Sequence, residues 1–270
     1  MKRPLFCEIC PLTYKISTEK EILKRKIQNW RSKETFCSER SAEKLPELIF
    51  AHQSTIRRRL GNVDMRLQEN KATNLQISAP KVTGILIRPG ETFSFWSLVG
   101  RNSAKNGYKE GMTIQKGEPK KGVGGGMCQF SNLIHWMVLH SDLTVTERHH
   151  HDQLDLFPDN GRTVPFGTGT SIVYNYRDYR FKNETDRTYQ LLVWTDEDHL
   201  FGELRAERPI PYQYNIYTQD EKFVREADGH IYRTGTVVRE TLDAGDKRLL
   251  GRDVIQQNHA RVVYEMELDE

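Results

Sequence analysis

The 270-residue chain lacks the features that mark several common protein classes. No stretch approaches the roughly 20 consecutive apolar residues of a transmembrane helix, so we expect no integral membrane segment. The formal net charge is only +3, which argues against nucleic acid as a partner. We find neither internal repeats nor low-complexity linkers. What remains is a globular protein with 37% hydrophobic residues, enough for a sizeable core.

Cysteine is scarce, with four residues, Cys7, Cys10, Cys37 and Cys128. The N-terminal segment shows no recognisable secretory signal, because an acidic residue and a proline interrupt its apolar stretch. We therefore expect a cytoplasmic protein with reduced thiols. Cys7 and Cys10 form one CxxC, but together with Cys37 and His52 the gaps fit no common zinc-finger spacing. We expect no metal and no other cofactor.

The N-terminal part, residues 1–73, is strongly charged and favours helices. Residues 19–30, EKEILKRKIQNW, fit an amphipathic helix, and residues 45–60 look like another. From about residue 82 the composition changes, and VTGILIRPGETFSFW predicts strand, turn and strand. Residues 101–123 are polar and predict a long loop or short strands.

A buried central helix is the clearest prediction. In residues 128–142, Phe130, Leu133, Ile134 and Met137 recur at helical spacing, and the remaining positions are also largely apolar. Strand-like runs follow at 143–147, 171–181, 189–195, 199–206, 212–219, 231–242 and 259–268. The order predicts an α+β fold with N-terminal helices, a central buried helix packed on a mostly antiparallel sheet, and a β-rich C-terminal tail. We divide the chain into a helical region 1–73, an α+β core 74–207 and a β-rich extension 208–270.

One short stretch, GGGMCQFSNLIHW, places Cys128 at the expected start of this helix, directly after Gly124, Gly125 and Gly126. A helix N-terminus stabilises a thiolate, and glycines admit a substrate and expose backbone N–H groups for an oxyanion. The side-chain amide of Gln129 would add a donor. His135 lies about 10 Å further along the helix axis, too far to act as the base of the thiol.

A general base would therefore come from the histidine run 149–151, which follows a predicted strand. The order cysteine on a helix, histidine beside a strand and a later polar residue is that of papain-like and NlpC-type hydrolases. Candidates for the group that orients the histidine are Asp152, Asp155, Asp178 and Asn183.

Other interpretations of the same residues stay open. A cysteine that begins an apolar helix is usually a packed core thiol, and a histidine run in a loop is often a polar surface stretch. A zinc site made of Cys128, His149, His151 and Asp152 lacks a recognisable ligand spacing. The segment GVGGG is no phosphate-binding loop, because no Gly-Lys-Ser/Thr follows it.

Five segments together resemble the VanW family: PGETFSFWSLVG, NGYKEGMTIQKG, GGGMCQFSNLIHWMVLH, ERHHH and DYRFKNETD. The resemblance implies a link to peptidoglycan and glycopeptide resistance, with a peptidoglycan precursor or peptide-like small molecule as the partner. The motif cysteine, glutamine and serine of the family fall on Cys128, Gln129 and Ser131. Its Arg-x-x-His pair falls on Arg148 and His151.

Two functions follow from this resemblance. In the first, a cysteine-dependent hydrolase or acyl-transferase acts on cell-wall peptide or amide bonds: Cys128 attacks, His151 is the base and then the acid, and Asp178 orients it. The three glycines, Gln129, Ser131, Arg148 and Asn183 would then bind the substrate. In the second, the protein binds a cell-wall precursor or envelope partner without catalysis, and Cys128 is packed at a helix start. The second is favoured by one departure, since Gly169 stands where the family usually has an aspartate.

Overall fold

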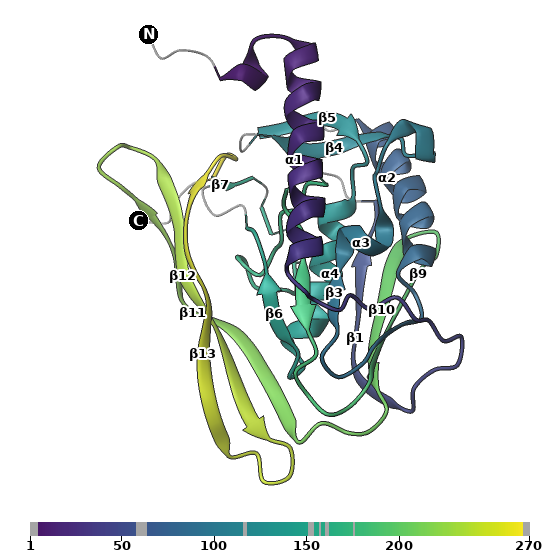
Figure 1. The fold of residues 1–270 in the computed structure, drawn as a ribbon. Helices are drawn as coiled ribbons and strands as arrows, with labels where there is room; N and C mark the ends of the chain where they lie inside the picture. Colours follow the sequence, from purple (N-terminus) through teal and green to yellow (C-terminus); the bar gives the residue numbers. More distant parts are fainter. Residues whose placement is uncertain are drawn as a thin grey trace.

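The computed structural model describes residues 5–57, 64–115, 118–150, 154–156, 158–159, 162–174 and 176–266. It confirms the α+β class (Figure 1). The α-helices of this part are α1 (Pro11–Arg31), α2 (Met65–Ser78), α3 (Phe95–Val99) and α4 (Met127–Leu139). Short 3-10 helices lie at Phe6–Glu8, Ala79–Lys81 and Ala104–Asn106. Among the residues described, no helix is long and apolar enough to cross a membrane.

Two antiparallel sheets and a hairpin form the core. The first sheet has the order β1-β10-β9-β2, with β1 (Glu47–Thr55), β10 (His199–Ala206), β9 (Tyr189–Thr195) and β2 (Ile85–Ile87). The second has the order β3-β8-β6, with β3 (Thr92–Ser94), β8 (Arg180–Lys182) and β6 (Thr144–Glu147). The hairpin consists of β4 (Glu110–Gln115) and β5 (Glu118–Val123).

A long twisted sheet of C-terminal strands runs along one side of the core (Figure 1). It contains β11 (Tyr212–Arg225), β12 (Ile231–Asp243) and β13 (Leu249–Val262), and β7 (Leu154–Asp155) pairs with β13 in parallel. Arg148 donates to the backbone carbonyl of Ile255 at 3.3 Å, which ties the core to this sheet. The β-rich C-terminal tail is thus confirmed.

Helix α4 is the buried centre of the fold, as its apolar pattern predicts. Phe130, Leu133, Ile134 and Met137 are at most 1% exposed. The helix packs on β1 and β10, and the approach is close: a Cβ on Gly202 of β10 would lie 2.5 Å from the Met137 side chain. Burial of several such side chains, each worth about 1.5–3 kcal/mol, makes this contact a main source of stability.

Three expected elements were wrong. The helix expected at 45–60 is absent from the described residues 45–57, because β1 occupies Glu47–Thr55 and pairs with β10, a partner far away in the sequence. Of the described residues in 171–181, only the start of β8 lies in a strand, because Val173 and Arg177 exchange backbone hydrogen bonds and the chain turns back on itself there. Strand β13 begins at Leu249 and ends at Val262, so the expected strand at 259–268 is only its end. The runs at 189–195 and 199–206 match β9 and β10.

Candidate functional site

The glycine turn before α4 is clamped by a buried asparagine of α2. Asn74 is fully buried, and its side-chain amide donates to the carbonyls of Gly125 at 2.9 Å and Lys109 at 3.1 Å. Its carbonyl oxygen accepts the backbone N–H of Lys109 at 2.8 Å. The sequence offered no signal for this role, because Asn74 lies in an ordinary polar stretch far from the glycines.

The glycines are required by packing and by backbone conformation. Gly126, the residue that caps α4, has φ +102°, which side-chain-bearing residues rarely adopt. A Cβ on Gly125 would lie 2.7 Å from the Cα of Gly111 in β4. Gly124 and Gly125 are buried. The turn is therefore held against neighbouring backbone, which accounts for the glycines without an oxyanion site.

Cys128 lies in the first turn of α4, as predicted, but its environment does not favour a thiolate. The residue is partly buried and packs against the hydrophobic core. Burial raises the pKa of the Cys128 thiol, and a hydrogen bond from the Ile172 backbone offsets this only in part. Since the thiolate is the reactive form, the described surroundings keep the sulfur in its unreactive form.

The polar residues after Cys128 fasten α4 to its neighbours. Gln129 donates its amide to Ser54 Oγ at 2.8 Å and to the Thr55 carbonyl at 2.9 Å, both in β1. Ser131 is buried, donates to the Cys128 carbonyl at 3.1 Å and bonds the hydroxyl of Thr170. Both side chains therefore have partners within the protein.

Asp178 is buried and its carboxylate is surrounded by donors. It accepts from Ser94 Oγ at 2.6 Å, from the backbone N–H of Trp96 at 3.0 Å and of Tyr179 at 2.9 Å, and from Arg180 Nε at 2.9 Å. These bonds join the strand of Arg180 to the start of α3. Such contacts are what a structural carboxylate makes.

Asn183 is another buried structural residue. Its amide donates to the carbonyls of Ile87 at 2.8 Å and Arg187 at 2.7 Å, and its oxygen accepts from Thr185. The turn between β8 and β9 is thereby closed on β2. The suggested role of Asn183 in substrate binding stays a prediction.

His151 and Asp152 lie outside the described residues, so the pairing of Cys128 with His151 stays a prediction. The other two histidines are placed: His149 Nε2 lies 3.0 Å from Glu147 Oε1, and the His150 ring would lie 3.7 Å from a Cβ on Gly169. A side chain at position 169 would therefore meet the histidine run. Asp155, another candidate, instead contacts Arg233 of β12 and Tyr264.

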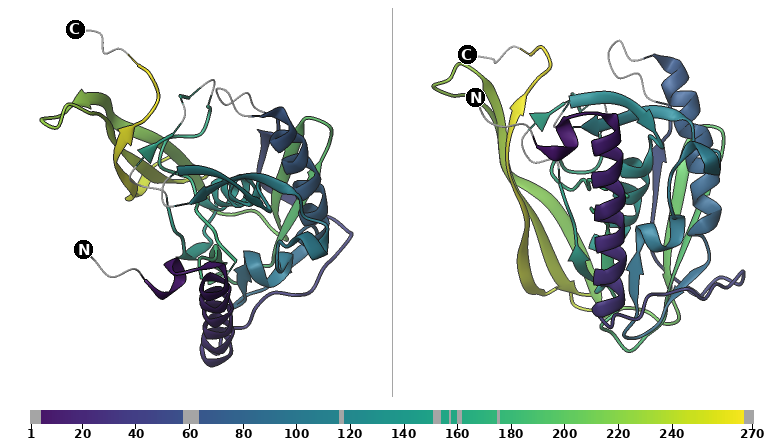
Figure 2. Two further views of the ribbon diagram at one scale, coloured as in Figure 1. Left: turned by 90° about the horizontal axis from the view of Figure 1, so that it is seen from above. Right: turned by 45° about the horizontal axis from the view of Figure 1, so that its top comes forward.

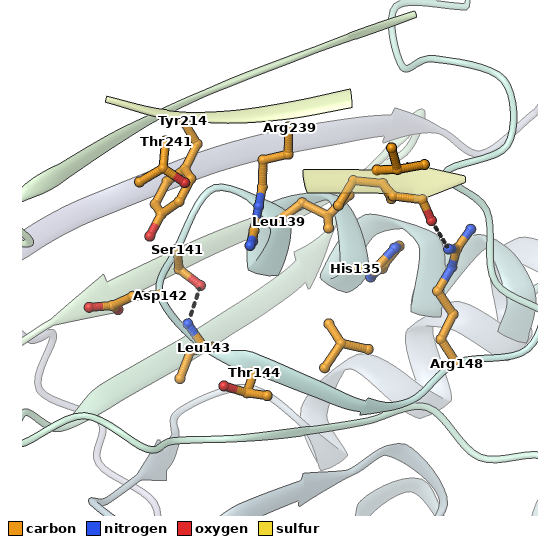
Figure 3. A pocket seen from close by; sticks show the side chains of 13 residues that line it. His135, Leu139, Ser141, Asp142, Leu143, Thr144, Arg148, Tyr214, Arg239 and Thr241 are labelled. Atoms are coloured by element: carbon orange, nitrogen blue, oxygen red, sulfur yellow. Dashed lines mark hydrogen bonds between the residues drawn. The ribbon is translucent and has the colours of Figure 1, made fainter. Parts of the chain in front are cut away.

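A cavity of about 450 Å³ lies between α4, β6 and the C-terminal sheet (Figure 3). His135 of α4, Arg148 after β6, Tyr214 of β11 and Arg239 of β12 line it. Arg148 donates to the carbonyls of Gly169, Gly167 and Ile255, so within the described residues two of its five N–H groups are left for another partner. Arg239 Nη2 donates to Asp253 at 3.0 Å.

Two buried nitrogen atoms at this cavity have no hydrogen-bond partner in the described part of the chain, His135 Nε2 and Arg239 Nε. His135 is 1% exposed, and its Nδ1 lies 3.0 Å from the Tyr179 hydroxyl. Burial, followed by the charges of Arg148, His150 and Arg239, holds the pKa of His135 well below its ordinary value. The imidazole is thus neutral at neutral pH.

The cavity has an excess of positive charge. Its acidic lining residue, Asp142, already bonds Arg187 at 3.1 Å and the Tyr189 hydroxyl. Arg239 shares its charge with Asp253 and keeps an Nε without a partner in the described residues. The guanidinium of Arg148, which has no carboxylate partner among these residues, and the unpartnered neutral imidazole add further donors, an arrangement suited to an anion such as a carboxylate. The sequence suggested Arg148 for substrate binding but gave no sign of His135 and Arg239, which long-range packing brings to the same cavity.

The thiol of Cys128 offers a first test of the site. We expect it to react slowly with iodoacetamide in the folded protein, with an apparent pKa above the ordinary value of about 8.5, because burial disfavours its thiolate. Exposed Cys10 is the internal control and should react readily. Peptide mapping of the alkylated protein measures both rates. Rapid alkylation of Cys128 near neutral pH would point to an activated nucleophile.

A family model and one of the similar proteins name the same family. Residues 70–205 match the family model described as VanW like protein. The chain is 34% identical over 220 residues to the vancomycin B-type resistance protein VanW of Enterococcus faecalis, covering 82% of this chain and 79% of that protein. It is 33% identical over 119 residues to the uncharacterized protein YoaR of Bacillus subtilis, covering 43% of this chain and 36% of that protein. No solved structure matches.

Proposed function

The chain belongs to the VanW family, and we propose that it binds the carboxylate end of a peptide-like cell-wall precursor without catalysis. The observation that carries the proposal is a cavity lined by Arg148, Arg239 and His135, whose buried Nε2 has no hydrogen-bond partner in the described part of the chain. Its volume of about 450 Å³ falls in the usual range of small-molecule sites.

The proposed recognition follows from donor geometry. If the Tyr179 hydroxyl donates to His135 Nδ1, the proton of the neutral ring lies on Nε2, which then donates into the cavity. An anion there would accept from this N–H and from the free N–H groups of Arg148 and Arg239. Each charge-assisted bond of this kind contributes about 1.5–3 kcal/mol, so the ligand's charge should determine the affinity.

We infer the chemical class of the ligand from the family to which the chain belongs. Its resemblance implies a link to peptidoglycan, and the E. faecalis relative is named for vancomycin resistance. With the cytoplasmic location expected from the sequence, the forms within reach would be nucleotide-linked or lipid-linked precursors on the inner side of the membrane. A peptide with a free carboxylate is the part of such a precursor that fits two arginines.

A cysteine-dependent hydrolase or acyl-transferase is the second candidate. The place of Cys128 in the first turn of a helix, after a glycine turn, favours it. Against it stand the raised pKa of the thiol, the buried donors around Asp178, and glycines that packing already requires. A binding function does not require Cys128, Asp178 or the glycines to leave their present contacts, so we rank it above catalysis.

Isothermal titration calorimetry tests the proposal with the nucleotide-linked muramyl pentapeptide and its C-terminal amide. We expect the free acid to bind and the amide to bind at least about tenfold more weakly, because the amide lacks the charge. Arg239→Gln should weaken binding of the acid on the order of 10- to 100-fold. The control Arg252→Gln, on the same sheet but exposed and paired with Glu240, should leave it unchanged. Equal affinity for acid and amide would contradict the proposal.

A further inference from the structure

Helix α1 carries a row of exposed apolar side chains along its length. Leu12, Ile16, Leu23, Ile27 and Trp30 are 64%, 49%, 59%, 42% and 81% exposed. Their separations of three, four and seven residues place all five on one face of the helix. Glu19 interrupts the row between Ile16 and Leu23. Singly exposed apolar residues are common, but five on one helix face indicate an interaction surface. We call these five residues the α1 stripe.

The face of α1 that meets the core is the polar one. Arg25 bonds Glu147, and Asn29 Oδ1 accepts from Arg180 Nη2 at 2.7 Å. Ile22 is the one buried residue that α1 contributes within the described structure. An ordinary surface helix would turn its apolar face inward, so this orientation is reversed. Figure 2 shows α1 at the periphery of the molecule, with no described element over its outer side.

Basic residues flank the stripe. Helix α1 contains six basic residues against two acidic ones. Arg25 bonds Glu147 on the core side, and the other five are Lys15, Lys20, Lys24, Lys26 and Arg31. Of the two acids, Glu19 is neutralised by Arg101 at 2.6 Å. A helix with an apolar row, a basic border and an exposed tryptophan has the chemistry of one that lies flat in the interface of an anionic membrane.

We infer that α1 docks this protein on an anionic lipid surface, with the stripe in the interface and the flanking lysines on the headgroups. The α1 stripe could alternatively pack against the same stripe of a second copy of the chain. Two such helices would, however, bring their flanking positive charges close together, which is unfavourable. Anionic headgroups instead complement this charge, and lysine stems extend to reach them. This inference is independent of the proposed function, because the cavity shares no residue with α1.

Vesicle flotation with the full chain tests the inference. We expect binding to vesicles of phosphatidylglycerol and phosphatidylcholine, and much weaker binding to phosphatidylcholine alone or at high salt. The double variant Leu23→Gln/Trp30→Gln should reduce the partition coefficient at least about tenfold. The triple variant Lys20→Gln/Lys24→Gln/Lys26→Gln should reduce it on the order of a hundredfold.

Matched control variants distinguish binding through the α1 stripe from nonspecific binding to vesicles. Leu250→Gln removes a comparably exposed apolar residue of β13, and Lys105→Gln removes an exposed charge elsewhere; both should bind as the unsubstituted chain does. All substituted residues of α1 are solvent-exposed, so circular dichroism should show unchanged folding. No flotation with anionic vesicles would overturn the inference. A dimer in sedimentation that the double variant converts to a monomer, without flotation, would assign the stripe to a second copy instead.

Discussion

Replacing Asp178 by alanine is expected to lower the free energy of unfolding by about 3–5 kcal/mol. Its buried carboxylate accepts from Ser94, from Arg180 and from the backbone N–H groups of Trp96 and Tyr179. Alanine would leave these buried donors without an acceptor, at a cost of about 1–3 kcal/mol each before relaxation. Urea unfolding followed by circular dichroism measures the change.

Two further variants sharpen this test. Asp178→Asn keeps an acceptor oxygen and should lose less stability than Asp178→Ala. Asp186→Ala removes an exposed carboxylate that pairs with Arg208 and should change stability little. If Asp178→Ala instead unfolds like the parent protein, the carboxylate has no structural role. The carboxylate would then be available to orient a catalytic histidine, and the hydrolase hypothesis would be favoured again.

Gly125→Ala is expected to destabilise the protein by about 3 kcal/mol. The added Cβ would lie 2.7 Å from the Cα of Gly111 and 2.8 Å from its carbonyl carbon. Both are backbone atoms of β4, which cannot give way as a side chain would, so the turn or the strand must shift. Urea unfolding measures the loss of stability, and the proton chemical shifts of α4 report the local displacement.

The matched control is Gly251→Ala in β13. A Cβ there would meet nothing within 4 Å, so the free energy of unfolding should change by less than about 0.5 kcal/mol. A Gly125→Ala protein of parental stability would show that the turn has room, as a substrate-admitting loop would. It would weaken the conclusion that packing alone requires the glycine.

Elements that local pattern determines could be predicted from the sequence. The period of Phe130, Leu133, Ile134 and Met137 specified α4, and these residues are buried as expected. Alternating runs likewise located β9 and β10. Strand β1 was missed because its apolar residues are equally compatible with a helix, and only pairing with β10, remote in sequence, decides between the two.

The orientation of an element was harder to predict than its existence. The amphipathic pattern around Ile22, Leu23, Ile27 and Trp30 specified a helix, yet Ile22 alone of these faces the core. Periodicity gives the apolar face but not the partner of that face. Here the charges of Glu147 and Arg180, in the strands beneath, select the polar side of α1.

The candidate site could be predicted only in part. The sequence placed Cys128 at a helix start, but the burial that raises the pKa of its thiol comes from the packing of the core around it, which no local motif shows. His135 was excluded as a base because of its distance from Cys128. It instead lines a cavity together with Arg239, a residue of the C-terminal sheet that no local motif connects with α4.

The most direct test of the central claim is the calorimetric affinity of Cys128→Ser and His135→Gln for the free-acid pentapeptide precursor. If the cavity is a carboxylate site and the cysteine is a packed residue, Cys128→Ser should bind as tightly as the parent protein. His135→Gln, at a residue whose Nε2 lacks a partner, should bind at least about tenfold more weakly. Loss of binding in Cys128→Ser together with full binding in His135→Gln would contradict the claim.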